Sequence, residues 1–326
     1  MMSASDGAFS YGRALAAKPA GDAPCRPRRR WRGERWRPYT PATVAPTPFQ
    51  LRGPRPLVGY LDLPDDPAPA PVVVLCCGFK GFAEWGFFPP LAALLAERGL
   101  AAVRFHYGDT GMQIGDAVVT DLEAFRRQTI SGELADVQTL LDALPQLAPG
   151  RLDTSRVALY GHSRGGAVAL LAAARLTDAG GPGGSALRAL VTWSSIAHFD
   201  RLSPEEVRDW RETGTWTAVN TRTGQRLPIG LDLLHDIEAH REEFDCSAAA
   251  ARRTAPWLIV HGDGDETVPI ADAEALAAAA APPAELLRIE GADHAFGAKT
   301  PFAGPNPLLI AALNATQTFL LRWLRA

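Results

Sequence analysis

The sequence predicts an α/β protein in which a mostly parallel sheet is covered by helices on both faces. Three observations carry this prediction. Short continuous apolar runs, such as residues 71–77, are typical of strands buried on both faces. Segments with helical spacing of apolar residues lie between these runs, and the two kinds of segment alternate to the C-terminus. A chain of 326 residues with 47% hydrophobic and 21% charged residues can also bury one large core.

The first two strands are expected to form an antiparallel hairpin at one edge of the sheet. Residues 49–52 and 57–61 alternate between apolar and polar side chains, and Gly53-Pro54 separates them. Further strands are expected at 71–77, 100–105, 157–160, 187–193, 257–260 and 285–289. Helices are expected at 88–98, 133–147, 165–176, 271–280 and 307–324.

A long interruption between residues 195 and 256 indicates an inserted element, because strand-to-helix connections are usually two to six residues long. We interpret about 197–254 as a small cap or lid on the C-terminal side of the sheet, where ligands bind in open α/β sheets. Its expected elements are a helix with Ser203 as N-cap and Glu206 three residues later, a hairpin of 215–220 and 225–229, and a helix at 231–244.

The N-terminal residues 1–45 are rich in Pro, Gly, Ala and Arg and show no periodicity, so we expect a disordered tail. An Arg/Trp cluster at 26–37 leaves open an acidic or nucleic-acid partner, but a solvated extension is the preferred interpretation. Residues 46–326 are then expected to form one domain that carries the cap insertion.

Composition excludes several function classes. The net charge of −3 gives no field that favours nucleic acid, a membrane or a polyanion. No long apolar span and no signal peptide is evident, so the expected location is the cytoplasm. Cys76 and Cys77 are adjacent in a strand and should face opposite sides, which argues against a disulfide. Because no cysteine or histidine pair has metal-site spacing, we expect neither a metal nor a cofactor.

The strongest local motif is the pentapeptide Gly161-His162-Ser163-Arg164-Gly165, which follows one predicted strand and precedes a helix. A sharp strand-to-helix turn lifts a serine hydroxyl above the sheet, and it needs small flanking residues for close approach. The alternative is a glycine-rich turn with an ordinary serine. The flanking strand and helix favour Ser163 as a catalytic nucleophile.

A serine hydroxyl needs a base within hydrogen-bond reach, and a carboxylate must hold that base in one tautomer. In this kind of fold the chain order is serine, acid, histidine. The segment 261–269 contains Asp263 and Asp265, and the segment 291–297 contains His294. Both segments follow predicted strands, so they lie at the same edge of the sheet as Ser163.

These motifs resemble the α/β-hydrolase superfamily, in particular the bacterial group of dienelactone-hydrolase-like and prolyl-oligopeptidase-like enzymes, over about residues 48–325. The resemblance implies the α/β-hydrolase fold. The family pattern H-G-x-x-D-x-x-V-P implies that Asp265 is the acid, and G-x-x-H implies that His294 is the base. Asp263 is the competing acid, which otherwise caps or hydrogen-bonds its loop.

A tetrahedral intermediate needs two backbone N–H donors at its oxyanion. Arg164, directly after the nucleophile, is expected to supply one. The segment Cys77-Gly78-Phe79-Lys80-Gly81 resembles the family's H-G-x-x-G loop and implies that Phe79 supplies the other. Cys77 departs from the usual histidine, which affects how the loop is anchored but not the backbone donor.

Other histidines and aromatic residues have weaker claims. His162 and His261 are expected to be structural, whereas His106 and His198 follow strands at the functional edge and could line the pocket. The candidates for an apolar wall, for which core packing is an equal explanation, are Phe82, Trp85, Phe87, Phe88, Trp193, Trp210 and Trp216. An aromatic pocket under a lid favours an acyl or aryl ester over a charged substrate.

The predicted function is hydrolysis of a carboxylic ester through an acyl-enzyme. A peptidase or amidase with the same triad is the nearest alternative, and Glu84, Glu205 or Glu206 could then bind the substrate amine. The alternative from another class is a noncatalytic α/β-hydrolase-like binding protein. We expect a small-molecule ester or a short peptide or amide as substrate, no nucleic acid and no membrane span.

Overall fold

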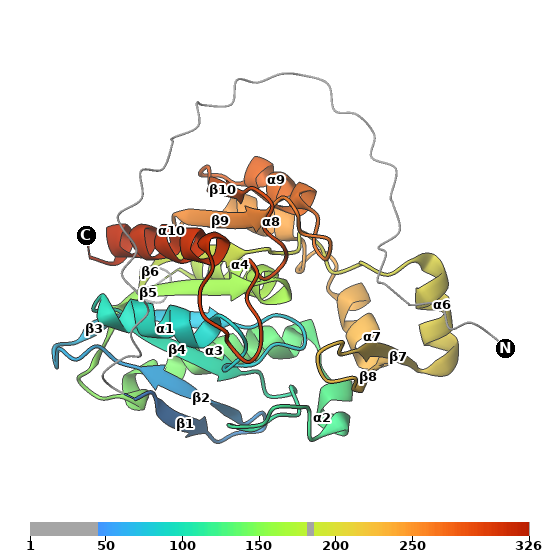
Figure 1. Ribbon diagram of the computed structural model, residues 1–326. Coiled ribbons are helices and arrows are strands. Elements are labelled where there is room, and N and C mark those ends of the chain that lie inside the picture. The colour runs from blue at the N-terminus through green and yellow to red at the C-terminus, as the bar shows by residue number, and fades with distance from the viewer. Residues whose placement is uncertain (1–44, 181–185, 326) are drawn as a thin grey trace, which may run out of the picture.

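A computed structural model describes residues 45–180 and 186–325. The predicted tail therefore lies outside the described residues, apart from residue 45. The centre of the fold is an eight-stranded sheet with the order β1-β2-β4-β3-β5-β6-β9-β10 (Figure 1). Its strands are β1 (Thr47–Leu51), β2 (Leu57–Asp62), β3 (Ala70–Cys76), β4 (Ala101–His106), β5 (Leu152–His162), β6 (Leu187–Trp193), β9 (Trp257–Gly262) and β10 (Glu285–Ile289).

The sheet is mostly parallel, as the alternation of strands and helices predicts. β1 pairs with β2, and β2 with β4, in antiparallel fashion, which confirms the hairpin at the edge. The remaining neighbours pair in parallel. All seven residues of β3 are buried, as expected for a central strand that is covered on both faces.

Helices cover both faces of the sheet and create two apolar cores. Apolar residues of α1 (Phe88–Glu97) and α10 (Pro307–Leu324) pack on one face, and α3 (Ile130–Leu147), α4 (Arg164–Ala179) and α9 (Ile270–Ala279) pack on the other. Cys76 lies in one core and Cys77 in the other, which confirms that their side chains face opposite sides. None of the described helices is long and apolar enough to cross a lipid bilayer.

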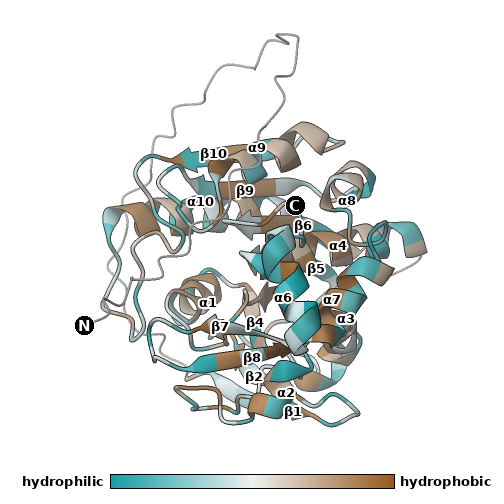
Figure 2. Ribbon diagram, turned by 90° about the vertical axis from the view of Figure 1, so that its right-hand side faces the viewer, coloured by the Kyte–Doolittle hydropathy of each residue, from teal (hydrophilic) through white to brown (hydrophobic). Residues whose placement is uncertain are grey.

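The interruption after β6 forms a separate group of elements, which we call the cap. It contains α6 (Pro204–Thr213), β7 (Thr215–Val219), β8 (Arg226–Gly230) and α7 (Leu231–Ala239), and α8 (Cys246–Arg252) follows. Ser203 and Glu206 form a complete capping box at the start of α6, and β7 pairs with β8 as a two-stranded antiparallel sheet. In Figure 2, much of α6 is hydrophilic on the side facing the viewer, in agreement with Trp210 as its only buried residue.

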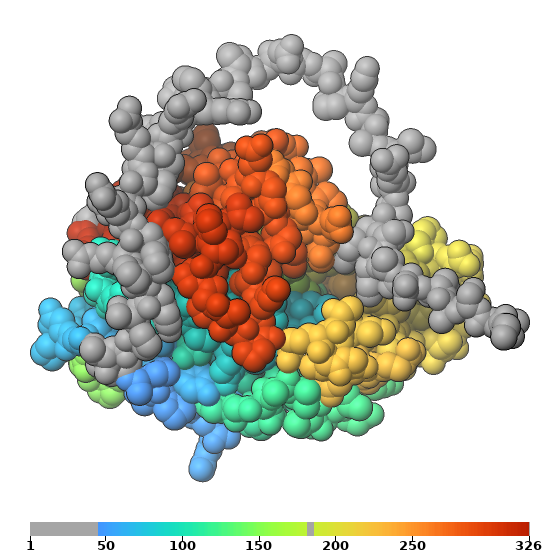
Figure 3. All heavy atoms as spheres, in the orientation of Figure 1, coloured from blue at the N-terminus to red at the C-terminus, as the bar shows by residue number. Residues whose placement is uncertain are grey.

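The cap rests on the chain that follows β4. The side chain of Gln225 accepts from the N–H of Val119 and donates to its carbonyl, at 3.0 and 2.9 Å. The carboxylate of Asp236 in α7 accepts two hydrogen bonds from Ser131 at the start of α3. β8 also contacts α2 (Leu122–Arg126), and the space-filling view shows the gold cap directly against this green segment (Figure 3).

Candidate active site

The predicted nucleophile occupies a strained turn between β5 and α4. Ser163 has φ 57° and ψ −125°, and a positive φ is unusual for a residue with a side chain. A Cβ on Gly161 would lie 2.1 Å from the carbonyl oxygen of Gly165, and a Cβ on Gly165 would lie 2.2 Å from the carbonyl oxygen of Cys77. Neither position has room for a side chain. The two glycines of the motif are therefore required by close backbone approach, as expected.

His294 and Asp265 form a hydrogen-bonded pair. Nδ1 of His294 lies 2.8 Å from Oδ2 of Asp265, and the other carboxylate oxygen accepts the backbone N–H groups of Thr267 and Val268, each at 2.9 Å. Burial alone raises the pKa of Asp265, but hydrogen bonds from His261, His294 and Val268 outweigh it and hold this pKa well below its usual range. An ionised Asp265 fixes the proton of His294 on Nδ1 and leaves Nε2 free to accept.

His162 and His261, which the sequence predicted to be structural, both contact this pair. Nε2 of His162 lies 2.9 Å from the carbonyl oxygen of His294, and the side chain stacks on Trp85 with ring centroids 5.9 Å apart. Burial, with a smaller contribution from the nearby His294, lowers the pKa of His162 to about 3, so its neutral ring donates to that carbonyl. Nε2 of His261 lies 2.8 Å from the carbonyl oxygen of Val268 and 3.4 Å from Asp265 Oδ2.

His162 places the turn that carries Ser163 beside the loop that carries His294. This residue directly precedes Ser163, and its ring centroid lies 4.7 Å from that of His294. Within residues 45–180 and 186–325, no hydrogen bond joins the Ser163 hydroxyl to the His294 ring. Such bonds are commonly long in unliganded enzymes and shorten when substrate binds.

The two aspartates that flank the pair have structural contacts. Oδ1 of Asp263, the competing acid, accepts the N–H of Gly291 at 2.7 Å, which ties together the two loops that carry Asp265 and His294. Oδ1 of Asp293 accepts the N–H of Ala295 at 3.1 Å and that of Gly297 at 2.7 Å. The role of Asp293 in shaping the histidine loop was not predicted, although an Asp next to a turn is a recognisable signal.

The loop after β3 passes directly against Ser163. A Cβ on Gly78 would lie 2.9 Å from the carbonyl oxygen of His162 and 3.0 Å from Cβ of Ser163. The N–H of Gly81 donates to the carbonyl of Gly78 at 2.9 Å and closes a tight turn. The N–H groups of Phe79 and Arg164 donate no hydrogen bond to any described residue, so both are available to a ligand.

The cap contacts this same loop (residues 77–81), which we call the oxyanion loop after the role that the sequence predicts for it. The Phe79 ring stacks on Trp216 of β7 with ring centroids 6.3 Å apart. The guanidinium carbon of Arg164 lies 4.6 Å from the centroid of the same Phe79 ring. Nζ of Lys80 donates to the carbonyl of Val219, also in β7, at 3.2 Å. The position of Phe79 therefore depends on the cap as well as on the sheet.

Several predicted pocket residues are in the core instead. Phe87, Phe88 and Trp193 are fully buried between the sheet and the α1–α10 layer. Phe82 is also buried, and Trp210 donates to the carbonyl of Ile229 inside the cap. For these side chains the structure favours core packing, which the sequence had left as an equal explanation, over an apolar pocket wall. Among the predicted cap aromatics, Trp216 alone contacts the oxyanion loop through a ring–ring contact in the described structure.

The two histidines considered as pocket residues have other contacts. His106 is buried, and its Nε2 lies 2.8 Å from the Glu84 carboxylate. His198 is exposed, and its Nδ1 lies 2.9 Å from Asp200. Neither residue lines the cavity beside the oxyanion loop.

That cavity differs from the aromatic pocket that the sequence led us to expect, because charged residues take part in its lining. Its polar walls come from segments far apart in the chain, namely Arg55, Lys80, Asp109, Gln128, Glu133 and Arg164. Met112, Val119 and Phe125 supply the apolar part. Sequence reasoning missed this group because no single motif contains two of its charged residues within a recognisable spacing.

The comparison with known proteins agrees with this fold. The model of the Alpha/beta hydrolase family matches residues 73–303, which is most of the chain, and the chain therefore belongs to that family. No curated protein matches it in a sequence search.

Solved structures share the fold at low sequence identity. Est1E from Butyrivibrio proteoclasticus is 21% identical with a TM-score of 0.62, and the match covers 86% of this chain and 99% of Est1E. The esterase domain of a Rhodothermus marinus protein is 18% identical with a TM-score of 0.58, covering 86% and 100%. A puromycin-hydrolyzing peptidase of Mycobacterium tuberculosis is 22% identical with a TM-score of 0.58, and the match covers 86% of this chain and 39% of the peptidase. The chain is thus a hydrolase-family protein with esterase-like structural neighbours.

Proposed function

We propose that this protein is a serine hydrolase that cleaves carboxylic esters through an acyl-enzyme, with Ser163 as nucleophile, His294 as base and Asp265 as the acid that orients the base. The observation that carries the proposal is the 2.8 Å hydrogen bond between His294 Nδ1 and Asp265 Oδ2, beside a serine held at φ 57°. This combination supplies a base of fixed tautomer next to a raised hydroxyl.

The reaction has two halves. His294 Nε2 takes the proton of Ser163 as its Oγ bonds to the ester carbonyl carbon, and the N–H groups of Phe79 and Arg164 stabilise the negative carbonyl oxygen. The intermediate collapses as the bond to the alcohol oxygen breaks and His294 returns the proton to that oxygen. Water then attacks the acyl-enzyme with the same proton transfers, releasing the acid and restoring Ser163.

The environment of the acidic residues favours an ester over a peptide with a free amine. Glu84 is engaged by His106 at 2.8 Å and by the N–H of Gly115 at 3.2 Å. Glu206 is occupied by the capping box of α6. Two of the three carboxylates considered for an amine site, Glu84 and Glu206, therefore already have partners, which makes these two poor cation sites for the peptidase alternative.

The first experiment is labelling with a fluorophosphonate probe together with hydrolysis of short and medium 4-nitrophenyl esters. We expect wild type to label and turn over, and Ser163→Ala to lose labelling and about 10⁴-fold or more of its activity. His294→Ala should show a comparable loss. Ser155→Ala is the matched control, since Ser155 is exposed and bonds only to Asp153. A folded wild type that neither labels nor hydrolyses any ester would refute the proposal.

A further inference from the structure

The side chain of Arg164 connects the two proposed oxyanion donors. The backbone N–H of Arg164 is one of these donors, and its guanidinium lies against the ring of Phe79, the residue that supplies the other. Arg164 is the first residue of α4, whereas Phe79 lies in the oxyanion loop after β3. One side chain therefore contacts both backbone segments that must converge on a single oxygen atom in the proposed reaction.

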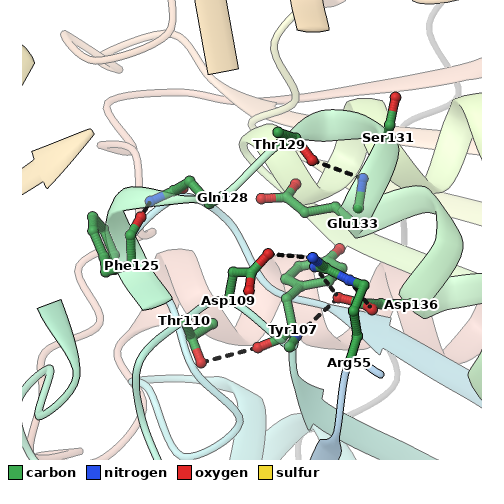
Figure 4. A network of polar contacts seen from close by, with 12 residues as sticks. Arg55, Tyr107, Asp109, Thr110, Phe125, Gln128, Thr129, Ser131, Glu133 and Asp136 are labelled. Carbon is green, nitrogen blue, oxygen red and sulfur yellow. Dashed lines mark hydrogen bonds and ion pairs between the residues drawn. The ribbon is translucent and has the colours of Figure 1, made fainter. Parts of the chain in front are cut away.

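Two buried acceptors hold the guanidinium in place. Nη2 of Arg164 donates to Oε1 of Gln128 at 2.5 Å and to Oε1 of Glu133. The amide of Gln128 also donates to the carbonyl of Phe125 at 2.7 Å, which leaves its oxygen for Arg164. In Figure 4 the carboxyl of Glu133 points from the start of α3 toward Gln128. The position of the guanidinium is thus determined from two places in the chain.

A planar guanidinium is suited to this double contact. Its edge carries the N–H donors and its face packs on an aromatic ring, whereas an apolar side chain of similar length offers only the packing. The side chain of Arg164 is 13% exposed and that of Glu133 is 4% exposed. Solvent screens such a pair much less than a surface pair, so the ion pair restrains the guanidinium firmly.

The ring of Phe79 also has contacts that come from outside α4. Its centroid lies 5.9 Å from that of Phe125 in α2 and 6.3 Å from that of Trp216 in β7. These contacts place the ring relative to the cap and to the segment after β4. The Arg164 guanidinium adds a contact with the helix whose first N–H is the second donor.

We propose that the Arg164 side chain is a positioning group for the oxyanion hole, and that Glu133 and Gln128 are positioning residues that act through it. The ion pair holds the guanidinium against the Phe79 ring, and this contact keeps the two N–H groups at the separation that one oxyanion requires. The inference rests on the proposed ester hydrolysis. It adds to that reaction a buried polar group, outside the triad, on which the rate depends.

The test measures kcat and KM for a short 4-nitrophenyl ester in Arg164→Met and Glu133→Gln, with active sites counted by fluorophosphonate titration. Both variants keep the backbone N–H of residue 164. The donors act on charge that develops in the transition state, so kcat per active site should fall about 10- to 100-fold while KM stays within about threefold of wild type. The assay is run at pH 8, above the pKa of about 7 to which burial raises Glu133, so that its carboxyl is ionised.

The double variant tests whether Glu133 acts through Arg164. If it does, adding Glu133→Gln to Arg164→Met should lower kcat no further than Arg164→Met alone, because the second change then removes a contact that is already lost. Losses that multiply in the double variant would mean that Glu133 acts by another route, and they overturn its assigned role.

Asp62→Asn is the matched control. Asp62 in β2 is buried and accepts from Nε of Arg104 in β4 at 2.8 Å, so this variant also removes one partner of a buried ion pair. It should lower the free energy of unfolding, measured with urea, and leave kcat per active site unchanged. Glu133→Gln keeps the size and shape of the side chain, so it carries the test if Arg164→Met fails to fold.

Each outcome separates this inference from the proposed function. Unchanged kcat per active site in both folded variants overturns the positioning role and leaves the ester hydrolysis standing. A raised KM with unchanged kcat also overturns it, since the side chain would then bind substrate instead of placing the donors. So does an equal loss of kcat in Asp62→Asn. A folded wild type that hydrolyses no ester overturns the proposed function and this inference with it.

Discussion

Replacing Gly165 by alanine tests whether the tight turn holds the nucleophile in position. The added Cβ would lie 2.2 Å from the Cys77 carbonyl oxygen and 2.5 Å from that of Cys76. An ordinary contact begins at 3.4 Å, so the end of β3 and the start of α4 must separate by about 1 Å. That displacement acts on the Phe79 donor and on Ser163 together. Because a misplacement of about 1 Å can cost about 10²-fold, we expect kcat/KM to fall by about that factor.

The assay is kcat/KM for a short 4-nitrophenyl ester, with urea unfolding of the same protein. Overpacking should also lower the free energy of unfolding by about 1–3 kcal/mol. Gly53→Ala is the control, because a Cβ at Gly53 meets nothing within 4 Å. If Gly165→Ala keeps its activity within about twofold of wild type, the close approach does not set the geometry of the nucleophile, and our reading of the turn is wrong.

Three further predictions follow from other contacts. Asp265→Asn should lower kcat for a short 4-nitrophenyl ester by about 10⁴-fold, because it disturbs the tautomer of His294. Asp263→Asn loses only a loop contact and should lower kcat by less than about tenfold. Equal losses of kcat in the two variants would contradict the assignment of Asp265 as the acid. The folded protein holds the Glu133 proton more tightly than the unfolded chain, so wild type should lose up to about 3 kcal/mol of stability as pH rises from about 4.5 through 7. Glu133→Gln should lack this loss, as measured by urea unfolding at pH 5.5 and 8. Ser203→Ala removes the capping box and should cost about 1 kcal/mol, read by thermal unfolding, and no change would mean that α6 is stabilised by packing alone.

The sequence predicted the structure best where the residues of a single segment determine it. The closing helix was predicted at 307–324 and observed at Pro307–Leu324, because its apolar spacing continues over five turns. The strand-turn-helix at Ser163 was also evident, since its glycines are required by local backbone contact. α2 and α8 were missed, and the helix predicted at 231–244 ends at Ala239. Helices of five or seven residues are too short to show a clear period.

The cavity could not be predicted because it depends on the order of the strands. Arg55 follows the first strand of a hairpin, Asp109 follows β4, and Glu133 belongs to a helix first turn. These segments meet only because β2 and β3 both lie beside β4 in the sheet. The same limitation explains why the sequence left pocket wall and core packing equally open for the aromatic residues, since it does not say toward which layer an aromatic side chain turns. The domain limits and the roles of Ser163, Asp265 and His294 stay predictions.

The contact of the cap with the oxyanion loop gives the cap a part in the proposed reaction as well as in covering the sheet. Trp216 of β7 stacks on Phe79, and the carbonyl of Val219 accepts from Lys80, so the backbone of this loop is supported from the cap. Under the proposed function, a change in β7 that loosens these contacts should therefore alter turnover without any change at Ser163, Asp265 or His294.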